Sequence, residues 1–329
     1  MIDEDEERPP KMFLKRRDTV GLETFLEHLG EAALSAEDMH KHAWAGGVSG
    51  IVADSLMHPF DTISTRLKVQ GAQIGGNAKY SGLWNTTRVM VREEGIRSLF
   101  KGVTATVYCA VPSSALYFGA YEWVKHVGIH VSEKSGAHTE YHADMVHLMA
   151  GISAELAASV IVVPFEVIKS RLQIGGKGGA LSGLWRIFQR EGMAGLFSGY
   201  RACILLDCTH SGLQFLFYER LKRLMKNDNA STFVEGTAQD IAIGALSGGI
   251  AAFISNPMDV IAVRLMTQDA LLNNRIYYKG TFDCLRSIAV NEGVRGLWSG
   301  SAARILSIAP LSALTFAVYE KMKWGLMTK

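Results

Sequence analysis

The chain has 329 residues, of which 48% are hydrophobic and 20% charged, and its formal net charge is +2. A net charge this close to zero argues against nucleic-acid binding, which usually needs a clustered basic surface. The four cysteines show no CxxC or other metal-ligand spacing, so free thiols and no metal site are expected.

The first 41 residues form an N-terminal extension that carries none of the motifs found later in the chain. They begin Met-Ile-Asp-Glu-Asp-Glu-Glu and contain no apolar core, which argues against a secretory signal. Their acidic residues are also untypical of a cleaved transit peptide. The extension is expected to be flexible, and an address for an organelle is expected to lie inside the remaining sequence.

Three repeats of about a hundred residues follow, each carrying the same three motifs in the same order. The first motif reads Pro-x-Asp/Glu, the second combines Glu-Gly with an aromatic-x-Gly step, and the third reads Tyr-Glu-x-x-Lys. Recurrence of three ordered motifs indicates a repeat architecture rather than chance similarity. The expected repeats span 42–133, 143–229 and 238–327.

Each repeat contains two apolar segments, and each segment is long enough for a helix to cross about 30 Å of hydrocarbon. In chain order, the expected spans are 42–66, 102–125, 145–171, 199–222, 238–265 and 300–324. Amphipathic pieces between the paired spans, such as 81–94 and 182–191, are expected to lie on the membrane surface.

Polar and charged residues interrupt all of these apolar segments. Intramembrane charges normally face a bundle interior or a water-filled cavity, so the pattern predicts helices that line a cavity. The sequence therefore predicts an all-α membrane protein with six transmembrane helices in three tandem two-helix repeats. The alternative is a soluble helical solenoid, whose repeats are usually shorter and lack a proline beside an acid in an apolar run.

The three motifs in triplicate resemble those of the mitochondrial carrier family over roughly residues 42–327. The resemblance implies a bundle with threefold pseudosymmetry, short surface helices on the matrix side, and one central substrate site that opens alternately to either side. It implies a monomeric, multi-pass transporter of the mitochondrial inner membrane. Cardiolipin is expected as a structural lipid at the helix N-termini near the aromatic-x-Gly motifs, with no other cofactor.

In this family, the acid of each Pro-x-Asp/Glu motif pairs with a cation three residues after the acid of the next repeat, which closes the matrix side. The cation positions hold Ser64, Lys169 and Ala262, so Asp61–Lys169 is the one pair expected. Uncompensated acids are costly, so a weak matrix gate is expected to favour the matrix-open state; tolerated drift is the alternative. The gate acids are Asp61, Glu166 and Asp259.

The resemblance places a second gate at the cytosolic end, where the Tyr-Glu-x-x-Lys motifs supply both charges. Each acid has a lysine available in another repeat, so this gate is expected to be complete. The expected pairs are Glu122–Lys222, Glu219–Lys323 and Glu320–Lys125.

Substrate contacts in the family lie mid-membrane at set distances from these motifs. Charges placed there usually serve function, although Glu155 could instead brace a neighbouring helix. Acids opposite one arginine suit a substrate with positive charge and one carboxylate, whereas nucleotides, phosphate or dicarboxylates would require several Lys/Arg. The expected contact residues are Asp54, Cys109, Glu155, Leu206, Asp207, Arg304 and Ser307.

Within the family, the chain is similar to S-adenosylmethionine carriers at Asp54, Glu155, Gln214-Phe215 and Arg304. It departs from them at Leu206-Asp207, where they carry Arg-Glu, and at Thr209, where they carry Pro. The expected arrangement places the substrate amine and sulfonium on Asp54 and Asp207 and its carboxylate on Arg304. S-adenosylhomocysteine is expected as the exchange partner.

Three other functions remain open. Iron carriers of the mitoferrin type place His at the Asp54 position and Pro-Ala-His where this chain has Pro112-Ser113-Ser114. A basic amino-acid carrier is a further candidate. A degenerate carrier acting as a scaffold would fit the eroded matrix gate, but not the charged cavity. An enzyme is not expected, because no nucleophile–base set or cofactor loop stands in a suitable setting.

Overall fold

The computed structural model describes residues 36–71, 79–134, 140–225, 233–271, 278–308 and 310–311. Contacts separate the chain into two units, Met1–Ala43 and Trp44–Lys329, and the motifs of all three repeats belong to the second unit. Every regular element in the described ranges is helical, which confirms the all-α prediction.

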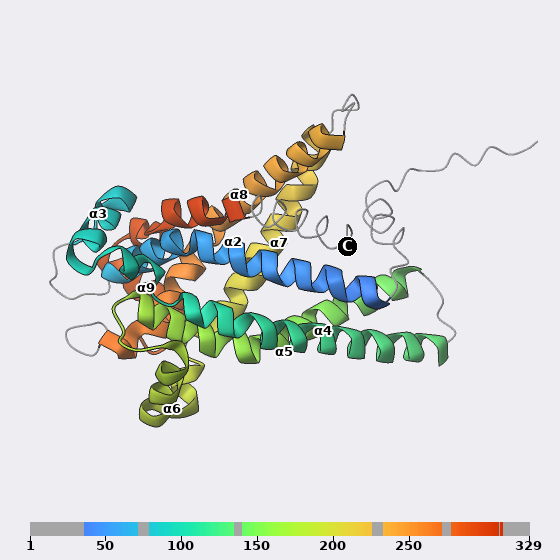
Figure 1. Ribbon diagram of the computed structural model, residues 1–329, viewed down its shortest axis with the longest axis horizontal. Coiled ribbons are helices and arrows are strands. Elements are labelled where there is room, and N and C mark those ends of the chain that lie inside the picture. The colour runs from blue at the N-terminus through green and yellow to red at the C-terminus, as the bar shows by residue number, and fades with distance from the viewer. Residues whose placement is uncertain are drawn as a thin grey trace, which may run out of the picture. The chain divides into compact units, whose positions relative to one another are not determined.

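The long helices are α2 (Ala36–Gln70), α4 (Val103–Lys134), α5 (Glu140–Gln173), α7 (Tyr200–Met225) and α8 (Phe233–Thr267), and a further helical segment is described at 301–308. The short elements are α3 (Gly82–Glu94), η1 (Ile96–Phe100), α6 (Ala180–Leu196), η2 (Gln268–Leu271), α9 (Thr281–Asn291) and η3 (Val294–Trp298). Short helices separate the long helix α2 from the pair α4 and α5, that pair from α7 and α8, and α8 from the last described segment (Figure 1). Consecutive long helices pack together, α4 against α5 and α7 against α8.

The long helices expose apolar side chains, as a membrane-spanning bundle requires. Leu148–Gln173 and Ile241–Ala270 have the length and hydropathy of a membrane span. Polar residues lower the hydropathy of others, such as Asp54 and Asp61 in α2 and Asp207 in α7. Exposed apolar residues on the long helices include Val111, Phe118, Leu148, Leu156 and Phe215.

A proline lies inside each of α2, α5 and α8, where it removes one intrahelical hydrogen bond. Many large apolar residues that follow these prolines are buried, among them Ile63, Val167 and Ile261. The hydrophobic core therefore lies where the C-terminal halves of α2, α5 and α8 converge, here called the proline end. The three prolines are Pro59, Pro164 and Pro257.

Arginine side chains join the C-termini of α2, α5 and α8 into a closed ring. The last carbonyl groups of a helix have no partner in their own helix. In each repeat, an arginine Nε donates to such a carbonyl in another repeat, so every one of the three C-termini is capped by a different repeat. The donor–acceptor pairs are Arg66–Gln173 (2.8 Å), Arg171–Met266 (2.9 Å) and Arg264–Lys68 (2.9 Å).

The same arginines attach the short helices to the long ones. Each guanidinium makes a bidentate contact with the glutamate of its own Glu-Gly motif, a geometry that satisfies a buried charge well. Because the guanidinium groups are almost completely buried, both contacts are needed to compensate them. The Nη2–Oε2 distances are 2.8 Å for Arg66–Glu94, 2.8 Å for Arg171–Glu191 and 2.7 Å for Arg264–Glu292.

The glycines of the aromatic-x-Gly motifs turn the chain into the helix that follows each motif, which begins at Val103, at Tyr200 and at 301. Gly102, Gly199 and Gly300 have φ of +95°, +80° and +78°, a region that favours glycine. A Cβ on Gly300 would lie 2.8 Å from the carbonyl oxygen of Ser64, and the other two glycines approach Lys169 and Ala262 in the same way. The motif therefore allows the backbones of different repeats to touch.

Candidate substrate cavity and gate

A cavity lies at the proline end between α2, α5, α8 and the segment 301–308. Polar and charged side chains from all three repeats line it. The cavity therefore brings together residues that the sequence assigns to a gate and residues that it assigns to a substrate site. Its charged lining residues are Asp61, Lys68, Glu166, Lys169, Asp259 and Arg304.

The expected pair between the first two repeats is formed. Lys169 Nζ lies 3.0 Å from Asp61 Oδ2. Gln173 Nε2 donates to the same carboxylate at 2.9 Å, and Thr65 Oγ1 donates to Gln173 Oε1 at 2.8 Å. The pair is thus supported by a hydrogen-bond chain that ties α2 to α5, and the sequence analysis did not foresee this support.

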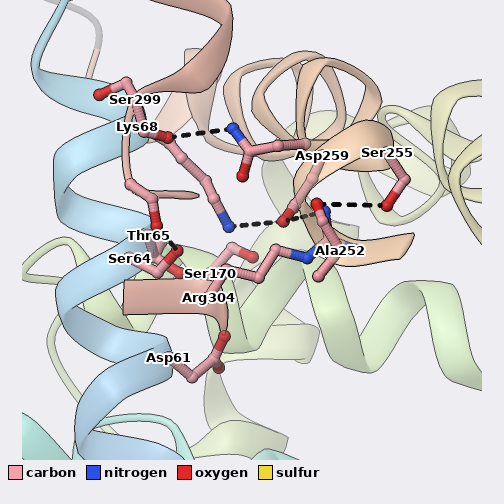
Figure 2. A network of polar contacts seen from close by, with 12 residues as sticks. Asp61, Ser64, Thr65, Lys68, Ser170, Ala252, Ser255, Asp259, Ser299 and Arg304 are labelled. Atoms are coloured by element: carbon pink, nitrogen blue, oxygen red, sulfur yellow. Dashed lines mark hydrogen bonds and ion pairs between the residues drawn. The ribbon is translucent and has the colours of Figure 1, made fainter. Parts of the chain in front are cut away.

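Asp259 is also paired, so the expectation that it lacks a cation is wrong. Lys68 Nζ donates to Asp259 Oδ2 at 2.6 Å, and both side chains are largely buried (Figure 2). Lys68 follows Ser64 by four residues and therefore shares its helix face. Ser64 itself donates to the carbonyl oxygen of Gly300 at 3.1 Å. The cation of the first repeat therefore lies one helical turn after Ser64, the position where the family carries it.

Arg304 approaches Asp259 from the segment 301–308, while Lys68 approaches it from α2 (Figure 2). Arg304 Nη1 lies 2.8 Å from Oδ2, the same oxygen that accepts from Lys68. Nη1 is buried and makes no hydrogen bond, so this contact is an ion pair without donor alignment. A residue expected to bind substrate is therefore in contact with a gate acid.

Glu166 is less well compensated by cations than Asp61 and Asp259. Its ion pair in the described residues is with Lys169, one turn along its own helix, at 3.2 Å. Lys169 is already shared with Asp61. Ala262, at the position where the family carries a cation, is buried and offers no charge. Among the described residues, two gate acids, Asp61 and Asp259, are thus paired with a cation of another repeat, where one such pair was expected.

The expected substrate residues other than Arg304 and Ser307 do not line this cavity; they lie on α2, α4, α5 and α7. Asp54 is exposed on α2, within electrostatic range of Lys169 and Asp61. Asp207 is exposed on α7, within range of Glu155 on α5 and of Arg304. Acids on α2, α5 and α7 are therefore close enough to one another or to the gate residues to interact electrostatically, and Arg304 adds a positive charge near Asp207.

The remaining contact candidates are uncharged. Cys109, on α4, is half-buried and lies within electrostatic range of Glu166 and Lys169. Ser307 lines the cavity beside Arg304. Leu206 is half-buried on α7, next to Asp207.

At the opposite end, the acids of the Tyr-Glu-x-x-Lys motifs pair within their own helices. Glu122 lies 3.4 Å from Lys125, and Glu219 lies 3.3 Å from Arg223. Lys222 lies 5.5 Å above the ring of Tyr218. Glu320 and Lys323 lie outside the described residues. The inter-repeat ion pairs of the described gate residues, Asp61–Lys169 and Lys68–Asp259, lie at the proline end.

Lys68, Gln173 and the three ring-forming arginines were not predicted from the sequence. Lys68 had a usable signal, because a lysine one turn beyond an empty cation position can reach the same acid. The arginines had a signal as well, since each stands five residues after a gate acid in all three repeats.

A sequence model of the family described as "Mitochondrial carrier protein" matches residues 35–131, 143–229 and 234–329. The chain belongs to the mitochondrial carrier family. Members of this family are transporters rather than enzymes, which agrees with a charged cavity between repeats.

Three relatives show the range within the family. Mitochondrial substrate carrier family protein E from Dictyostelium discoideum is 32% identical, covering 85% of this chain and 93% of the relative. S-adenosylmethionine carrier 1 from Arabidopsis thaliana is 32% identical, covering 85% of this chain and 77% of the relative. Mitoferrin from Dictyostelium discoideum is 29% identical, covering 86% and 93%. The chain is about equally similar to relatives whose names give different substrates. Sequence identity therefore does not choose the substrate, and the residues of the candidate site must.

Proposed function

We propose that the chain carries S-adenosylmethionine across the mitochondrial inner membrane by alternating access, in exchange for S-adenosylhomocysteine. The observation that carries this proposal is the charge around the cavity. Carboxylates from α2, α5 and α7 outnumber the cations near them, and Arg304 lies at the proline end of the same region. A substrate with positive charge and one carboxylate complements this distribution.

Each charged part of the substrate has a partner in the proposal. Asp54 and Asp207 bind the amine and the sulfonium, and Arg304 binds the carboxylate through its guanidinium fork. Glu155 lies within electrostatic range of Asp207 and adds negative charge there. Cys109, Leu206 and Ser307 supply the uncharged contacts. Polyanionic substrates would meet repulsion from the same carboxylates.

The relative named S-adenosylmethionine carrier 1 supports this substrate, and the relative named mitoferrin makes Fe²⁺ the comparison. Leu206-Asp207 and Thr209 differ from the pattern of S-adenosylmethionine carriers. These residues lie on α7, and the loss of the arginine next to Asp207 bears on how the nucleoside part is recognised.

Reconstitution into liposomes tests the proposal directly. Purified protein is supplied with labelled S-adenosylmethionine, lysine, arginine or Fe²⁺, with S-adenosylhomocysteine inside the vesicles. We expect exchange of S-adenosylmethionine, and a loss of about tenfold or more in Asp54→Asn, because a charge-assisted contact is removed. Glu93→Gln is the matched control, since Glu93 is exposed on α3 and pairs with exposed Lys79.

Other outcomes identify other functions. Transport of Fe²⁺ without S-adenosylmethionine would favour a mitoferrin-like carrier, and transport of lysine or arginine would favour a basic amino-acid carrier. Absence of transport for every solute would favour the non-transporting scaffold.

The proposal also includes the membrane setting. It places a monomer in the inner membrane with cardiolipin bound near the starts of the helices that follow Gly102, Gly199 and Gly300. Exposed N–H groups at helix N-termini favour phosphate, which supports this position. Native mass spectrometry of the purified protein measures both the oligomeric state and the retained lipid.

A further inference from the structure

Histidine is concentrated in one short stretch of the chain, at the junction of the first two repeats. Five of the chain's ten histidines lie in the range 126–147, where α4 ends and α5 begins. Short histidine-rich tracts are typical of metal binding. Two of the five, His126 and His130, belong to α4 and have described side chains, so the geometry of a metal site can be examined there.

The two imidazoles already lie at the separation that a shared metal ion requires. His126 and His130 stand four residues apart on α4, so their side chains share one face of the helix. Their ring centroids are 4.5 Å apart, and the ring planes are inclined at 59°, which excludes a parallel stack. Two imidazoles that bind one ion through nitrogen atoms at about 2.0–2.1 Å bring their centroids to within roughly 5 Å.

The pair is accessible to ions in the aqueous phase. Both imidazoles are exposed, and they follow Lys125, the last residue of the expected span. Imidazole nitrogen suits Zn²⁺, Cu²⁺, Ni²⁺ and Fe²⁺, whereas Mg²⁺ and Ca²⁺ prefer oxygen ligands. The described residues contain no group of three or more His, Cys, Asp or Glu side chains placed to bind an ion, so the remaining ligands of such an ion are water molecules.

We propose that His126 and His130 form a two-histidine site for a divalent transition-metal ion, with Zn²⁺ as the ion to test. Histidines at i and i+4 of a helix offer two nitrogen atoms to one ion, as in the zinc-binding helices of metalloproteases. Because the second histidine is held beside the first, its binding is effectively intramolecular and strengthens the site. The alternative is an aromatic contact between two rings that gains nothing from metal.

The site lies one helical turn from a gate residue. Glu122 precedes His126 by four residues, shares its helix face and contacts Lys125 at 3.4 Å. A divalent charge on this face attracts the Glu122 carboxylate and opposes its expected pairing with Lys222. A bound ion should therefore disfavour closure of this end and slow exchange, and this consequence rests on the proposed function.

Isothermal titration calorimetry of the full-length, tag-free protein in detergent measures Zn²⁺ binding directly. The matched control is the swap variant His130→Val/Val131→His, which keeps the composition and places the second histidine at a position that is also exposed. The two histidines are then five residues apart and no longer share a helix face. We expect the swap variant to bind Zn²⁺ at this site at least about tenfold more weakly, because the chelate is lost. His126→Ala should have the same effect.

Thermal unfolding gives a second measurement. An ion that binds the folded chain raises its unfolding temperature, and Zn²⁺ at about a hundred times its Kd should raise that of the wild type by about 3 °C or more. The swap variant should unfold at the wild-type temperature without metal and respond less to Zn²⁺. Equal temperatures without metal show that the swap leaves the fold intact.

The outcomes separate the site from its consequence. Absence of Zn²⁺ binding by the wild type, or equal affinity and stoichiometry in the swap variant, would overturn the site whatever the transport result. In proteoliposomes with Zn²⁺ on both sides, we expect exchange of S-adenosylmethionine to slow at least about threefold more in the wild type than in the swap variant. An equal response would overturn the link to the gate while the site stands. Absence of exchange without metal would overturn the proposed function, and calorimetry would still decide the site.

Discussion

Lys68 shows how a gate cation can move along a helix without losing its acid. Its position, four residues after Ser64, keeps it on the same helix face, and its long side chain reaches Asp259. The small Ser64 then serves another purpose, since its hydroxyl binds the carbonyl oxygen of Gly300. The eroded motif of the first repeat is therefore compensated within α2.

Replacing this lysine tests the compensation. Lys68→Gln leaves Asp259 with Arg304 alone, so we expect a loss of about 2 kcal/mol in stability, below the 3–5 kcal/mol typical of a buried acid with no cation. Thermal unfolding in detergent measures the change.

The double variant Lys68→Gln/Ser64→Lys returns the cation to the family position. Partial recovery of stability over Lys68→Gln is expected, because the new lysine can reach Asp259 at the cost of the Ser64–Gly300 hydrogen bond. A double variant no more stable than Lys68→Gln would show that the position of the cation matters and not only its charge.

Glycine at the start of the second helix of each repeat permits contact between elements. Gly300→Ala would combine a positive φ with a Cβ 2.8 Å from the carbonyl oxygen of Ser64. We expect a loss of about 2 kcal/mol in stability. Gly244→Ala is the control, because Gly244 lies within α8 and a Cβ there meets nothing within 4 Å. The control is expected to stabilise by up to about 1 kcal/mol. Equal thermal shifts in the two variants would contradict this account.

The attachment of α3 to α2 predicts a pH dependence. Hydrogen bonds from Arg66, and then from Lys101, lower the pKa of Glu94 from 4.5 to about 2. A carboxylate with a lowered folded pKa contributes stability that is present above its unfolded pKa and is lost as pH falls through its folded pKa. We therefore expect this contribution to decline between about pH 4.5 and pH 2.

The variant Glu94→Gln isolates that contribution. Thermal unfolding measured across the same pH range should show a shallower loss of stability in the variant than in the wild type. Parallel pH profiles would mean that the Arg66–Glu94 contact adds no pH-dependent stability.

The balance between conformations depends on the whole set of gate pairs. In the described residues, the gate acids Asp61 and Asp259 each pair with a cation of another repeat, whereas Glu166 lacks a cation from the third repeat. Ala262→Lys supplies this cation. Added stabilisation of about 1 kcal/mol in the closed state should slow exchange by several-fold and raise the unfolding temperature. Faster exchange would show that the buried lysine disrupts packing instead.

The sequence predicted most of the fold because the repeat makes its constraints visible three times. Apolar length, the prolines and the aromatic-x-Gly glycines each have a local physical cause, and the structure places them accordingly. The Asp61–Lys169 pair followed from the family pattern. The Lys68–Asp259 pair did not follow from that pattern. Whether the cation stands at position 64 or at position 68 depends on how closely the backbone of Gly300 approaches Ser64.

Arg304 illustrates the same limit at the substrate site. Counting from the motif placed its Cα near the middle of the membrane, but a long side chain can reach a charge a turn or more away. Only the arrangement of α8 beside the segment 301–308 brings Asp259 within 2.8 Å of its guanidinium. Residue spacing indicated Arg304 and Ser307, which line the cavity, and the reach of the Arg304 side chain determines that it contacts Asp259.

The three arginine caps form a cyclic set of contacts. Each of Arg66, Arg171 and Arg264 caps a helix of another repeat, so the contacts do not depend on which repeat comes first in the chain. A circular permutant that begins at the second repeat would keep every cap, whereas a two-repeat fragment would leave one helix end open and one buried arginine unsatisfied. Cyclic permutation should therefore be tolerated far better than truncation, and the three repeats should unfold as one cooperative unit.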